Sequence, residues 1–349
     1  MKAMSAPNWE EVYDGGSPEA ETAIFLELAD QMLAIQEANR QKAGRDHADR
    51  TLHAKMTVGV TDAVLSVDAT IPDAFRTAHF EPGARLRTAV RFSNASALAQ
   101  ADTSPDMRGA ALKIWLGADA EDVPWDEVIR AQPEQHTHDL LMTSYPVSHA
   151  RNARQFVDFA VAAQGPRETL VERLVAKFGQ SETQRMLANI QQGARSCESL
   201  ALQRFWSRGA VLWGTQPVRF DLRPIDAAPA ATRAFDGPDA LRDEFAERLR
   251  ACDVRFRLAV QPFVDLTRTP IEDAAVAWSE DASAPVEIAT LTIARRSLES
   301  ADAKRQADTV AAMAFNPWHA PAACRPLGNL NRVRGVVYGK SAQRWQRGG

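Results

Sequence analysis

The sequence predicts an α+β protein in which about eight mostly antiparallel strands close into a β-barrel, with helices inserted between the strands. Two observations lead to this prediction. Runs with period-two alternation occur in two groups, and a long stretch with helical spacing separates them. Strands and helices do not alternate regularly, which argues against a parallel sheet. A closed barrel buries that many strands without exposed edges, and 349 residues are enough to build a large core around it.

An amphipathic helix is expected before the first strand. Apolar residues recur at spacings of three and four over residues 19–43, and the pattern ends near Gly44. The polar face is rich in Glu and Gln, which is typical of an arm packed on its own subunit or, in a homo-oligomer, on a neighbouring one. The sequence favours neither arrangement. We expect residues 1–49 to form an N-terminal helical arm and residues 50–349 to form the barrel domain.

The strands follow in two groups. The run over residues 50–69 indicates a hairpin or one long bent strand. Further extended runs are expected at residues 85–94, 108–116, 138–143, 210–222, 254–263 and 286–293. Residues 148–195, between the two groups, have helical spacing with breaks at Pro166 and Gly179. This order of strands, helices and strands is the basis of the α+β prediction.

Composition and charge exclude several classes of partner. A chain that is 45% hydrophobic and 25% charged is typical of a globular domain, and a net charge of −4 gives no excess of positive charge for binding nucleic acid. The first residues lack the apolar core of a secretion signal, and no later run is long enough to span a membrane. Three scattered cysteines indicate neither a disulfide framework nor a zinc site. We therefore expect a cytoplasmic protein with reduced thiols.

Charged and aromatic side chains in three segments suggest a chemical site. Arg334 and Tyr338 are four residues apart, so in a helix they share a face and the guanidinium can stabilise an ionised phenol. A tyrosine phenolate is a suitable ligand for ferric iron. Near the other end of the chain, the first strand begins with Arg50 and His53. The second extended run supplies another cation and a hydroxyl, at residues 91 and 93.

Six short motifs occur in the order in which one known family has them. They are H-A-K at 53–55, V-R-F-S at 90–93, S-P-D-M-R-G at 104–109, F-N-P-W-H at 315–319, R-P-L-G at 325–328 and R-x-x-x-Y at 334–338. Together they are specific, although each alone is weak. The chain resembles the haem catalases, and most closely the compact catalase-like proteins that include monofunctional peroxidases and the allene oxide synthase domain. The resemblance spans residues 50–338 and implies an antiparallel eight-stranded β-barrel of catalase type.

The resemblance also implies a cofactor, haem b, and a role for each matching residue. It implies that Tyr338 is the proximal iron ligand on a C-terminal helix, with Arg334 as its charge partner. On the distal side it implies His53 as the acid and base, assisted by Ser93. It implies further haem contacts, namely two propionate-binding arginines and a stacking phenylalanine: Arg50, Arg91 and Phe156.

The sequence departs from the family at three places, namely Thr143, Met56 and Ala342. Thr143 stands where the family has a distal asparagine, so a hydroxyl replaces a carboxamide as a possible donor to peroxide. Met56 replaces a frequent glycine after H-A-K, and Ala342 replaces a common histidine after the proximal tyrosine. A third propionate contact is expected from either Arg344 or Arg347. His319 and Cys324 could instead supply a thiolate or imidazole ligand in competition with Tyr338, which is the less favoured hypothesis.

Three functions are compatible with these residues. The leading hypothesis is a haem hydroperoxidase that acts on hydrogen peroxide or organic hydroperoxides with a small reducing co-substrate. The second is an isomerase or dehydratase of fatty-acid hydroperoxides, which the altered distal side and the compact size suggest. The third is a haem-binding or sensing protein without fast turnover, since Thr143 replaces the distal amide.

Overall fold

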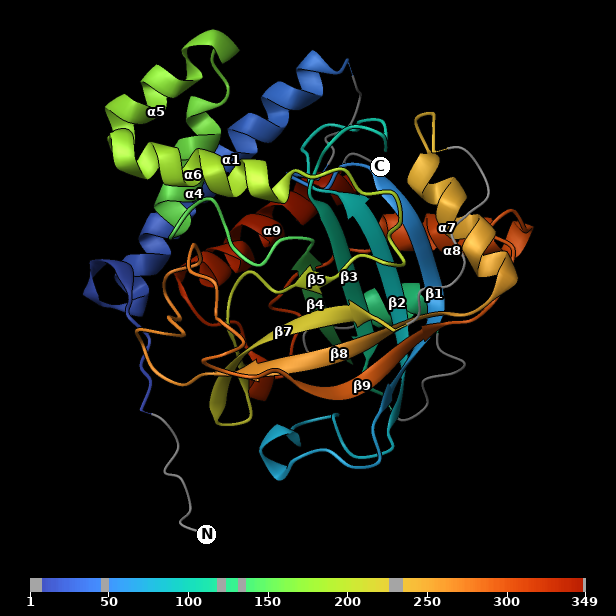
Figure 1. The fold of residues 1–349 in the computed structure, drawn as a ribbon. Helices are drawn as coiled ribbons and strands as arrows, with labels where there is room; N and C mark the ends of the chain where they lie inside the picture. The colour runs from blue at the N-terminus through green and yellow to red at the C-terminus, as the bar shows by residue number, and fades with distance from the viewer. Residues whose placement is uncertain (1–7, 45–49, 118–123, 131–135, 226–234, 348–349) are drawn as a thin grey trace.

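The computed structural model describes residues 8–44, 50–117, 124–130, 136–225 and 235–347. Its centre is a β-barrel of antiparallel strands (Figure 1). The strands are β1 Met56–Val67, β2 Arg85–Asn94, β3 Arg108–Trp115, β4 Thr137–Thr143, β5 Phe205–Trp206, β6 Val211–Trp213, β7 Gln216–Pro224, β8 Val254–Pro262 and β9 Val286–Ile293.

Eight of these strands form the closed ring. Their order is β4-β3-β2-β1-β9-β8-β7-β5, and the ring closes because β5 pairs with both β7 and β4. β6 lies outside the ring and forms a hairpin with β7 through a turn at Gly214, whose φ is 68°. A positive φ favours glycine there. The prediction of an α+β fold with an antiparallel eight-stranded barrel is confirmed.

Most strands lie where the period-two alternation of apolar and polar residues predicted them. The run over residues 50–69 contains one long strand, β1, which covers only Met56–Val67. Register shifts between Met56 and Val58 and between Val60 and Ala63 interrupt its pairing with β2. The run over residues 210–222 is a hairpin of two strands. β5 was not predicted, because Phe205–Trp206 is too short for a periodic pattern.

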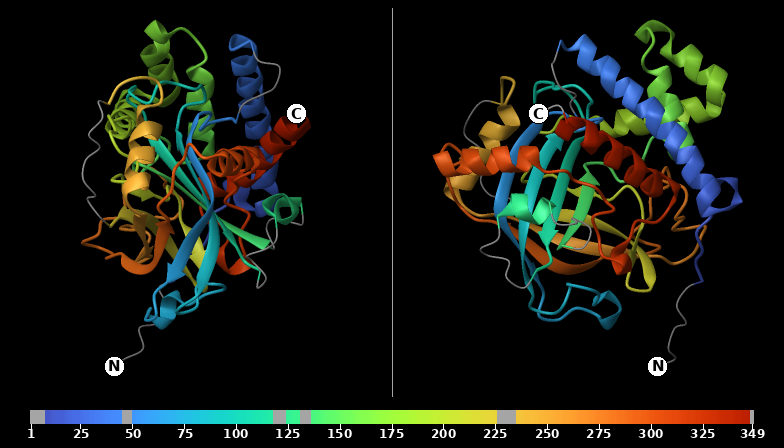
Figure 2. Two further views of the ribbon diagram at one scale, coloured as in Figure 1. Left: turned by 90° about the vertical axis from the view of Figure 1, so that its right-hand side faces the viewer. Right: turned by 180° about the vertical axis from the view of Figure 1, so that it is seen from behind.

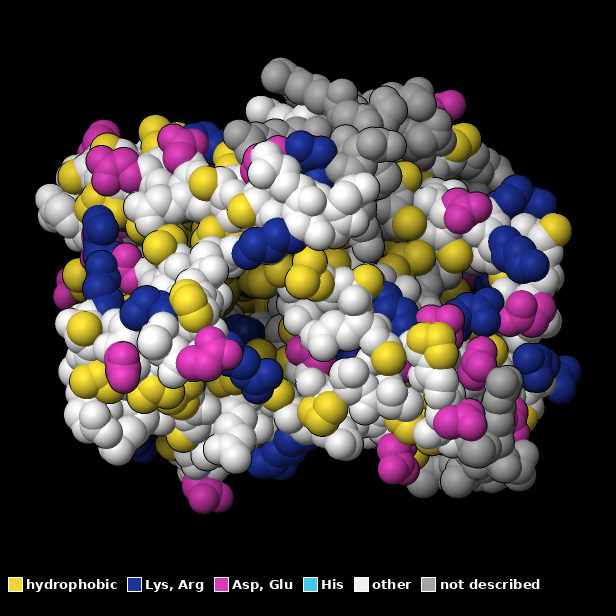
Figure 3. Space-filling view, turned by 90° about the horizontal axis from the view of Figure 1, so that it is seen from above, with side chains coloured by type: hydrophobic (Ala, Val, Ile, Leu, Met, Phe, Trp, Pro, Cys, Tyr) yellow, Lys and Arg dark blue, Asp and Glu magenta, His cyan; other side chains and the backbone are white. Residues whose placement is uncertain are grey.

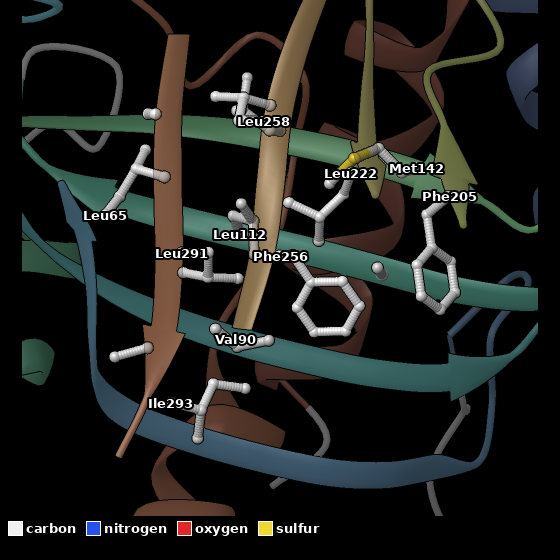
Figure 4. Packing of buried hydrophobic residues seen from close by; sticks show 14 of the residues in the cluster. Leu65, Val90, Leu112, Met142, Phe205, Leu222, Phe256, Leu258, Leu291 and Ile293 are labelled. Atoms are coloured by element: carbon white, nitrogen blue, oxygen red, sulfur yellow. The ribbon is translucent and has the colours of Figure 1, made fainter. Parts of the chain in front are cut away.

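Large apolar side chains fill the inside of the barrel (Figure 4). Phe92 lies at the centre of a group of rings, with ring centroids 5.5 Å from Phe205, 5.5 Å from Phe245 and 6.0 Å from Phe256. Phe245 belongs to helix α7 (Ala240–Ala251). Each such buried ring contributes roughly 1.5–3 kcal/mol relative to an exposed one. The barrel interior is therefore a packed core, and the space for a ligand lies elsewhere.

Helices cover part of the outside of the barrel (Figure 2). α1 (Pro18–Lys42) begins with the Ser17 side chain as its N-cap and Pro18 in its first turn. It packs beside α9 (Asn329–Arg347) and α4 (Ala153–Ala162) in one apolar cluster, which includes Phe25, Leu28, Met32, Val157, Val333 and Val337. α5 (Leu170–Phe178) and α6 (Gln180–Gly193) continue from α4.

Polar contacts also attach α1 to α9. The buried Glu21 accepts hydrogen bonds from Arg332, at 2.6 Å from Nε and 2.8 Å from Nη2. Gln36 Nε2 donates to Ser341 Oγ over 2.9 Å. The predicted helix therefore packs on its own chain. The division into an arm at residues 1–49 and a barrel domain at residues 50–349 stays a prediction.

Two further helices lie near the barrel, and neither was predicted from the sequence. α8 (Ala301–Ala312) packs against β1 and places Val310 and the adjoining Met313 in a cluster with Trp115 and Trp125. α2 (Trp125–Arg130) contributes Trp125 to the same cluster, and its indole donates to the Thr61 carbonyl over 3.0 Å. None of the described helices is long and apolar enough to cross a membrane.

Candidate functional site

A cavity of about 230 Å³ lies between the outer face of β2–β4 and the helices α1, α4 and α9. All eight candidate residues line it: Arg50, His53, Arg91, Ser93, Thr143, Phe156, Arg334 and Tyr338. Seen from above, the surface is hollowed near the middle, and hydrophobic side chains gather in the hollow with Lys and Arg side chains beside it (Figure 3). The structure thus brings together residues that are up to 288 positions apart, from Arg50 to Tyr338.

Strand register builds one wall of the cavity. Ser93 pairs with Gly109, which pairs with Thr143, so the three stand side by side on the outer face of the barrel. Two residues earlier on β2, Arg91 pairs with Ala111. Gly109 leaves space that no other residue could leave, because a Cβ there would lie 2.5 Å from His53 Nδ1.

His53 lies just before β1 in a left-handed conformation with a φ of 60°. Its Nδ1 is 2.8 Å from the Asn94 carbonyl oxygen and 3.1 Å from Ser93 Oγ. A carbonyl can only accept, so Nδ1 carries the proton and Nε2 is left with a lone pair. Burial and the nearby charge of Arg91 lower the pKa of His53 to about 3, so the imidazole is a neutral base at pH 7.

Two of the candidate arginines donate hydrogen bonds to backbone carbonyls. Arg91 donates from Nη2 to the His53 carbonyl over 2.8 Å, while its Nε is buried without a hydrogen-bond partner among the described residues. Burial lowers the pKa of Arg91 well below its ordinary value. Arg50 donates to the carbonyls of Ala311 and Met313, over 3.0 and 2.6 Å, at the end of α8. Arg50 therefore also fixes the end of that helix.

The Thr143 hydroxyl is already used as a donor. Thr143 Oγ1 donates to the Tyr145 carbonyl over 3.0 Å. A hydroxyl has one proton, so towards the cavity this oxygen is left as an acceptor. The structure thus removes the donor that the sequence alone left open at this position.

α9 supplies the opposite wall. It follows Gly328, which has a φ of 80° and passes so close to the Ile271 carbonyl that a Cβ would lie 2.4 Å from that oxygen. Arg334 lies over the Tyr338 ring, with its Cζ 5.2 Å from the ring centroid. Its Nη1 donates to Asn331 Oδ1 over 2.9 Å. The helical spacing of Arg334 and Tyr338 is as predicted, and the guanidinium contacts the ring face.

Arg208 is a cavity residue that the sequence did not reveal. It lies between β5 and β6 in a short turn, where a single arginine carries no periodic signal. Together with Arg50, Arg91 and Arg334 it gives the cavity four guanidinium groups. None of the described residues that line the cavity is an aspartate or a glutamate. The cavity is therefore strongly positive and suited to an anionic ligand.

The competing ligand pair is separated in the structure. His319 lines the cavity, but its Nδ1 lies 3.2 Å from Asp139 Oδ2 and 3.3 Å from Lys113 Nζ. Lys113 and Asp139 form a fully buried ion pair at 2.7 Å. Cys324 is buried outside this cavity, and burial raises the pKa of its thiol to about 12. A thiol in such surroundings stays protonated, which makes it a poor metal ligand.

The remaining predicted contacts lie on two helices. Phe156, on α4, packs against His149 with ring centroids 4.9 Å apart. Ala342, on α9, lines the cavity. Arg344 and Arg347 are in the last turns of α9, and their side chains lie outside the described residues. Met56 begins β1 and packs with the cluster around Trp115.

The sequence matches no protein-family model and no curated protein. Solved structures of catalases share the fold. A fungal catalase superposes with a TM-score of 0.64 at 18% identity, over 85% of this chain and 59% of that chain. Catalase A from Saccharomyces cerevisiae gives 0.65 at 16% identity, over 88% and 63%. A bacterial catalase gives 0.61 at 16% identity, over 90% and 60%. This chain thus has a catalase-like fold and spans about three fifths of the length of these proteins.

Proposed function

We propose that this chain is a haem-dependent hydroperoxidase that reduces or disproportionates hydrogen peroxide or organic hydroperoxides. One observation carries the proposal. A neutral histidine base, a tyrosine and four arginines line one cavity, and none of the described lining residues is acidic. The catalase-like fold supports a peroxide-related function, because the three catalases described above share it.

The residues of the cavity fit haem b. The two propionates of haem b need cations, and Arg50 and Arg91 are assigned to them. The Nε of Arg91 is buried and has no hydrogen-bond partner among the described residues, so it is a donor available for a ligand. Tyr338 is assigned as the ligand of the iron, with Arg334 over its ring. Phe156 is assigned to stack on the macrocycle from α4. When bound, haem b supplies the redox chemistry that accepts the oxidising equivalents of the peroxide.

The protein's own contribution is proton transfer. His53 Nε2 takes the proton from a bound hydroperoxide and returns it to the departing oxygen, which leaves as water or an alcohol. Asn94 and Ser93 hold the imidazole in the tautomer that leaves Nε2 free. With haem b bound, a small reducing co-substrate or a second peroxide molecule would supply the two electrons and two protons that complete the reduction of the peroxide.

Absorption spectra of the purified holoprotein with and without peroxide test the assignment. Tyr338→Phe is expected to lose haem or to change the ligand band, because a phenylalanine offers the iron no oxygen. His53→Ala is expected to bind haem but to react with peroxide at least about a hundredfold more slowly. His136→Ala is a control outside the cavity lining and should behave as the wild type. A holoprotein that neither evolves oxygen nor oxidises any co-substrate with peroxide refutes the proposal.

A second function is favoured by Thr143. Its hydroxyl donates to Tyr145, and Leu141, Met142 and Val157 nearby are apolar, so the cavity suits a fatty-acid hydroperoxide that is rearranged or dehydrated without an external reductant. Product analysis with a lipid hydroperoxide decides between the two functions. An epoxide or ketol product supports isomerase or dehydratase activity, and recovery of the reduced alcohol alone eliminates it.

The same residue motivates the third function, a haem-binding or sensing protein. In that case the wild type binds haem with negligible turnover, and Thr143→Asn restores activity by supplying a carboxamide donor. Thr143→Ser is the matched control, because it keeps a hydroxyl. Fast turnover by the wild type eliminates this function.

A further inference from the structure

Two hydroxyl groups that line the cavity have no role in the assignments above. Thr51 directly follows Arg50, and Ser341 lies about one turn after Tyr338 on α9. Both side chains are buried, and Thr51 Oγ1 lies 3.2 Å from Ser341 Oγ. The hydrogen bond between them joins the segment before β1 to α9, so the pair stands where the strand wall and the helical wall of the cavity meet.

A third side chain determines how the protons of this pair are used. Gln36, on α1, donates from Nε2 to Ser341 Oγ over 2.9 Å. An amide N–H can only donate, and each of the two hydroxyls carries one proton. One of these protons forms the hydrogen bond between Thr51 and Ser341. The other has no acceptor among the described residues, whichever of the two hydroxyls is the donor.

The surroundings indicate what can accept this second proton. A buried hydroxyl proton without an acceptor is unfavourable, so an acceptor atom of a ligand is expected there. The cavity carries four guanidinium groups, and none of its described lining residues is acidic. A hydrogen bond to an ionised acceptor is roughly twice as strong as one to a neutral acceptor. A carboxylate oxygen is therefore the acceptor that this part of the cavity favours.

We propose that Thr51 and Ser341 form a donor site for one carboxylate oxygen of the ligand, and that this carboxylate is a propionate of haem b. The inference rests on the proposed function, because it needs haem b in the cavity. The site adds a neutral donor to the arginine contacts assigned above. Gln36 is a positioning residue for the pair, because it occupies one lone pair of Ser341 and so leaves the second hydroxyl proton for the ligand.

The rate of haem release tests the proposal. Thr51→Val and Ser341→Ala each leave one hydroxyl that can donate, so each is expected to release haem b within about threefold of the wild-type rate. The double variant removes both hydroxyls and is expected to release haem b at least about tenfold faster, because a hydrogen bond to a charged group is lost. Transfer of haem b to excess apomyoglobin, followed by absorption, measures these rates. Thr88→Val is the matched control, because Thr88 is a buried threonine outside the cavity lining.

Haem dimethyl ester separates a donor role from a structural one. Its two propionates are esterified and uncharged, so the wild type and the double variant are expected to release it at rates within about twofold of each other. A double variant that releases both compounds faster by the same factor has a packing defect, and that result refutes the donor role. If the double variant does not fold, Thr51→Val combined with Ser341→Cys takes its place, because a thiol keeps the size of the side chain but is only a weak donor.

The outcomes also separate the inference from the proposed function. A wild type that does not bind haem b refutes the proposed function, and the inference with it. A wild type that binds haem b, together with a folded double variant that releases it at the wild-type rate, refutes only the donor site.

Discussion

At the scale of single residues, the cavity depends on positions with small side chains and on side chains whose hydrogen-bond donors already have backbone partners. Gly109 and Ala111 have small side chains, or none, on the outer face of β3 and so leave space for the cavity. The Thr143 hydroxyl donates a hydrogen bond to the Tyr145 carbonyl, and His53 Nδ1 donates one to the Asn94 carbonyl. Among the described distal residues, His53 Nε2 is therefore the nitrogen with a free lone pair that can act as a base. Both the available space and the available proton acceptor follow from local contacts.

Gly109→Ala tests this use of space. The added Cβ would lie 2.5 Å from His53 Nδ1 and 2.8 Å from Ser93 Oγ, so the imidazole must move. We expect kcat/KM with peroxide to fall by about a hundredfold, because displacing a catalytic group by about 1 Å has effects of that size. Steady-state kinetics check the result, and near-native far-UV circular dichroism shows that the fold is kept. Wild-type kinetics in a folded Gly109→Ala protein would contradict the account of the distal wall.

The same scale shows why the sequence revealed some residues and not others. His53, Arg334 and Tyr338 belong to motifs whose residue types and spacing carry a chemical meaning. Arg208 lies alone in a turn and reaches the cavity only through the pairing of β5 with β4 and β7, which is a long-range contact that no local pattern encodes. The hydrogen bond of the Thr143 hydroxyl likewise depends on the turn after β4.

At the scale of elements, the attachment of α1 to α9 holds the helical wall of the cavity together. Glu21 is buried and joins Arg332 with two hydrogen bonds. On the surface, the same two helices are joined by Lys340 and Asp30, with 2.7 Å between Nζ and Oδ1. The two contacts join the same helices but differ in exposure, so they form a matched pair.

Glu21→Ala is expected to lower the free energy of unfolding by roughly 2–4 kcal/mol, because it removes a buried partner of Arg332. Lys340→Ala is the control and should lower it by less than about 1 kcal/mol, since exposed ion pairs contribute little. Denaturant unfolding of both variants measures the difference. Equal effects of the two substitutions would show that the buried pair does not anchor α1.

Strand and helix prediction was reliable where an element is long and one of its faces is buried. β2 and β9 have the predicted bounds, and α1 lies within one residue of its predicted ends. β5 was missed because it has only two residues. α8 was missed, and its packing on β1 is a tertiary contact that the local sequence does not encode. Closure of the ring was inferred because a closed barrel leaves no strand edge exposed. The pairing of β5 with β4 and β7 that closes it could not be predicted from hydrophobic periodicity.

At the scale of the whole molecule, several buried histidines make stability depend on pH. Burial lowers the pKa of His149 to about 3 and that of His79 to about 4, and it also lowers the pKa of His138. The folded-state pKa values lie below the unfolded value of about 6.5, so below pH 6.5 the unfolded chain binds more protons. Their contribution to stability is complete above that pH and is lost as the pH falls.

Denaturant unfolding of the apoprotein at pH 7.5 and 5.5 checks this dependence. His53, whose pKa is also lowered to about 3, behaves in the same way. We expect the free energy of unfolding to drop by roughly 1 kcal/mol for each of these four histidines between the two pH values. His149→Phe should reduce the drop by about one quarter, because an aromatic ring without a titrating group keeps the contacts with Phe156 and Phe159. A free energy that is the same at both pH values would contradict the burial of neutral imidazoles.

The place of the cavity, outside the barrel and under α9, also affects the order in which the protein can be assembled. The residues assigned to the distal wall, from His53 to Thr143, leave the ribosome long before Tyr338, which α9 carries 195 positions after Thr143. Domains fold as their segments emerge, so the strand wall can form first while the cavity still lacks its far side. A ligand that needs both walls is therefore retained only after α9 has emerged and docked on the strand wall.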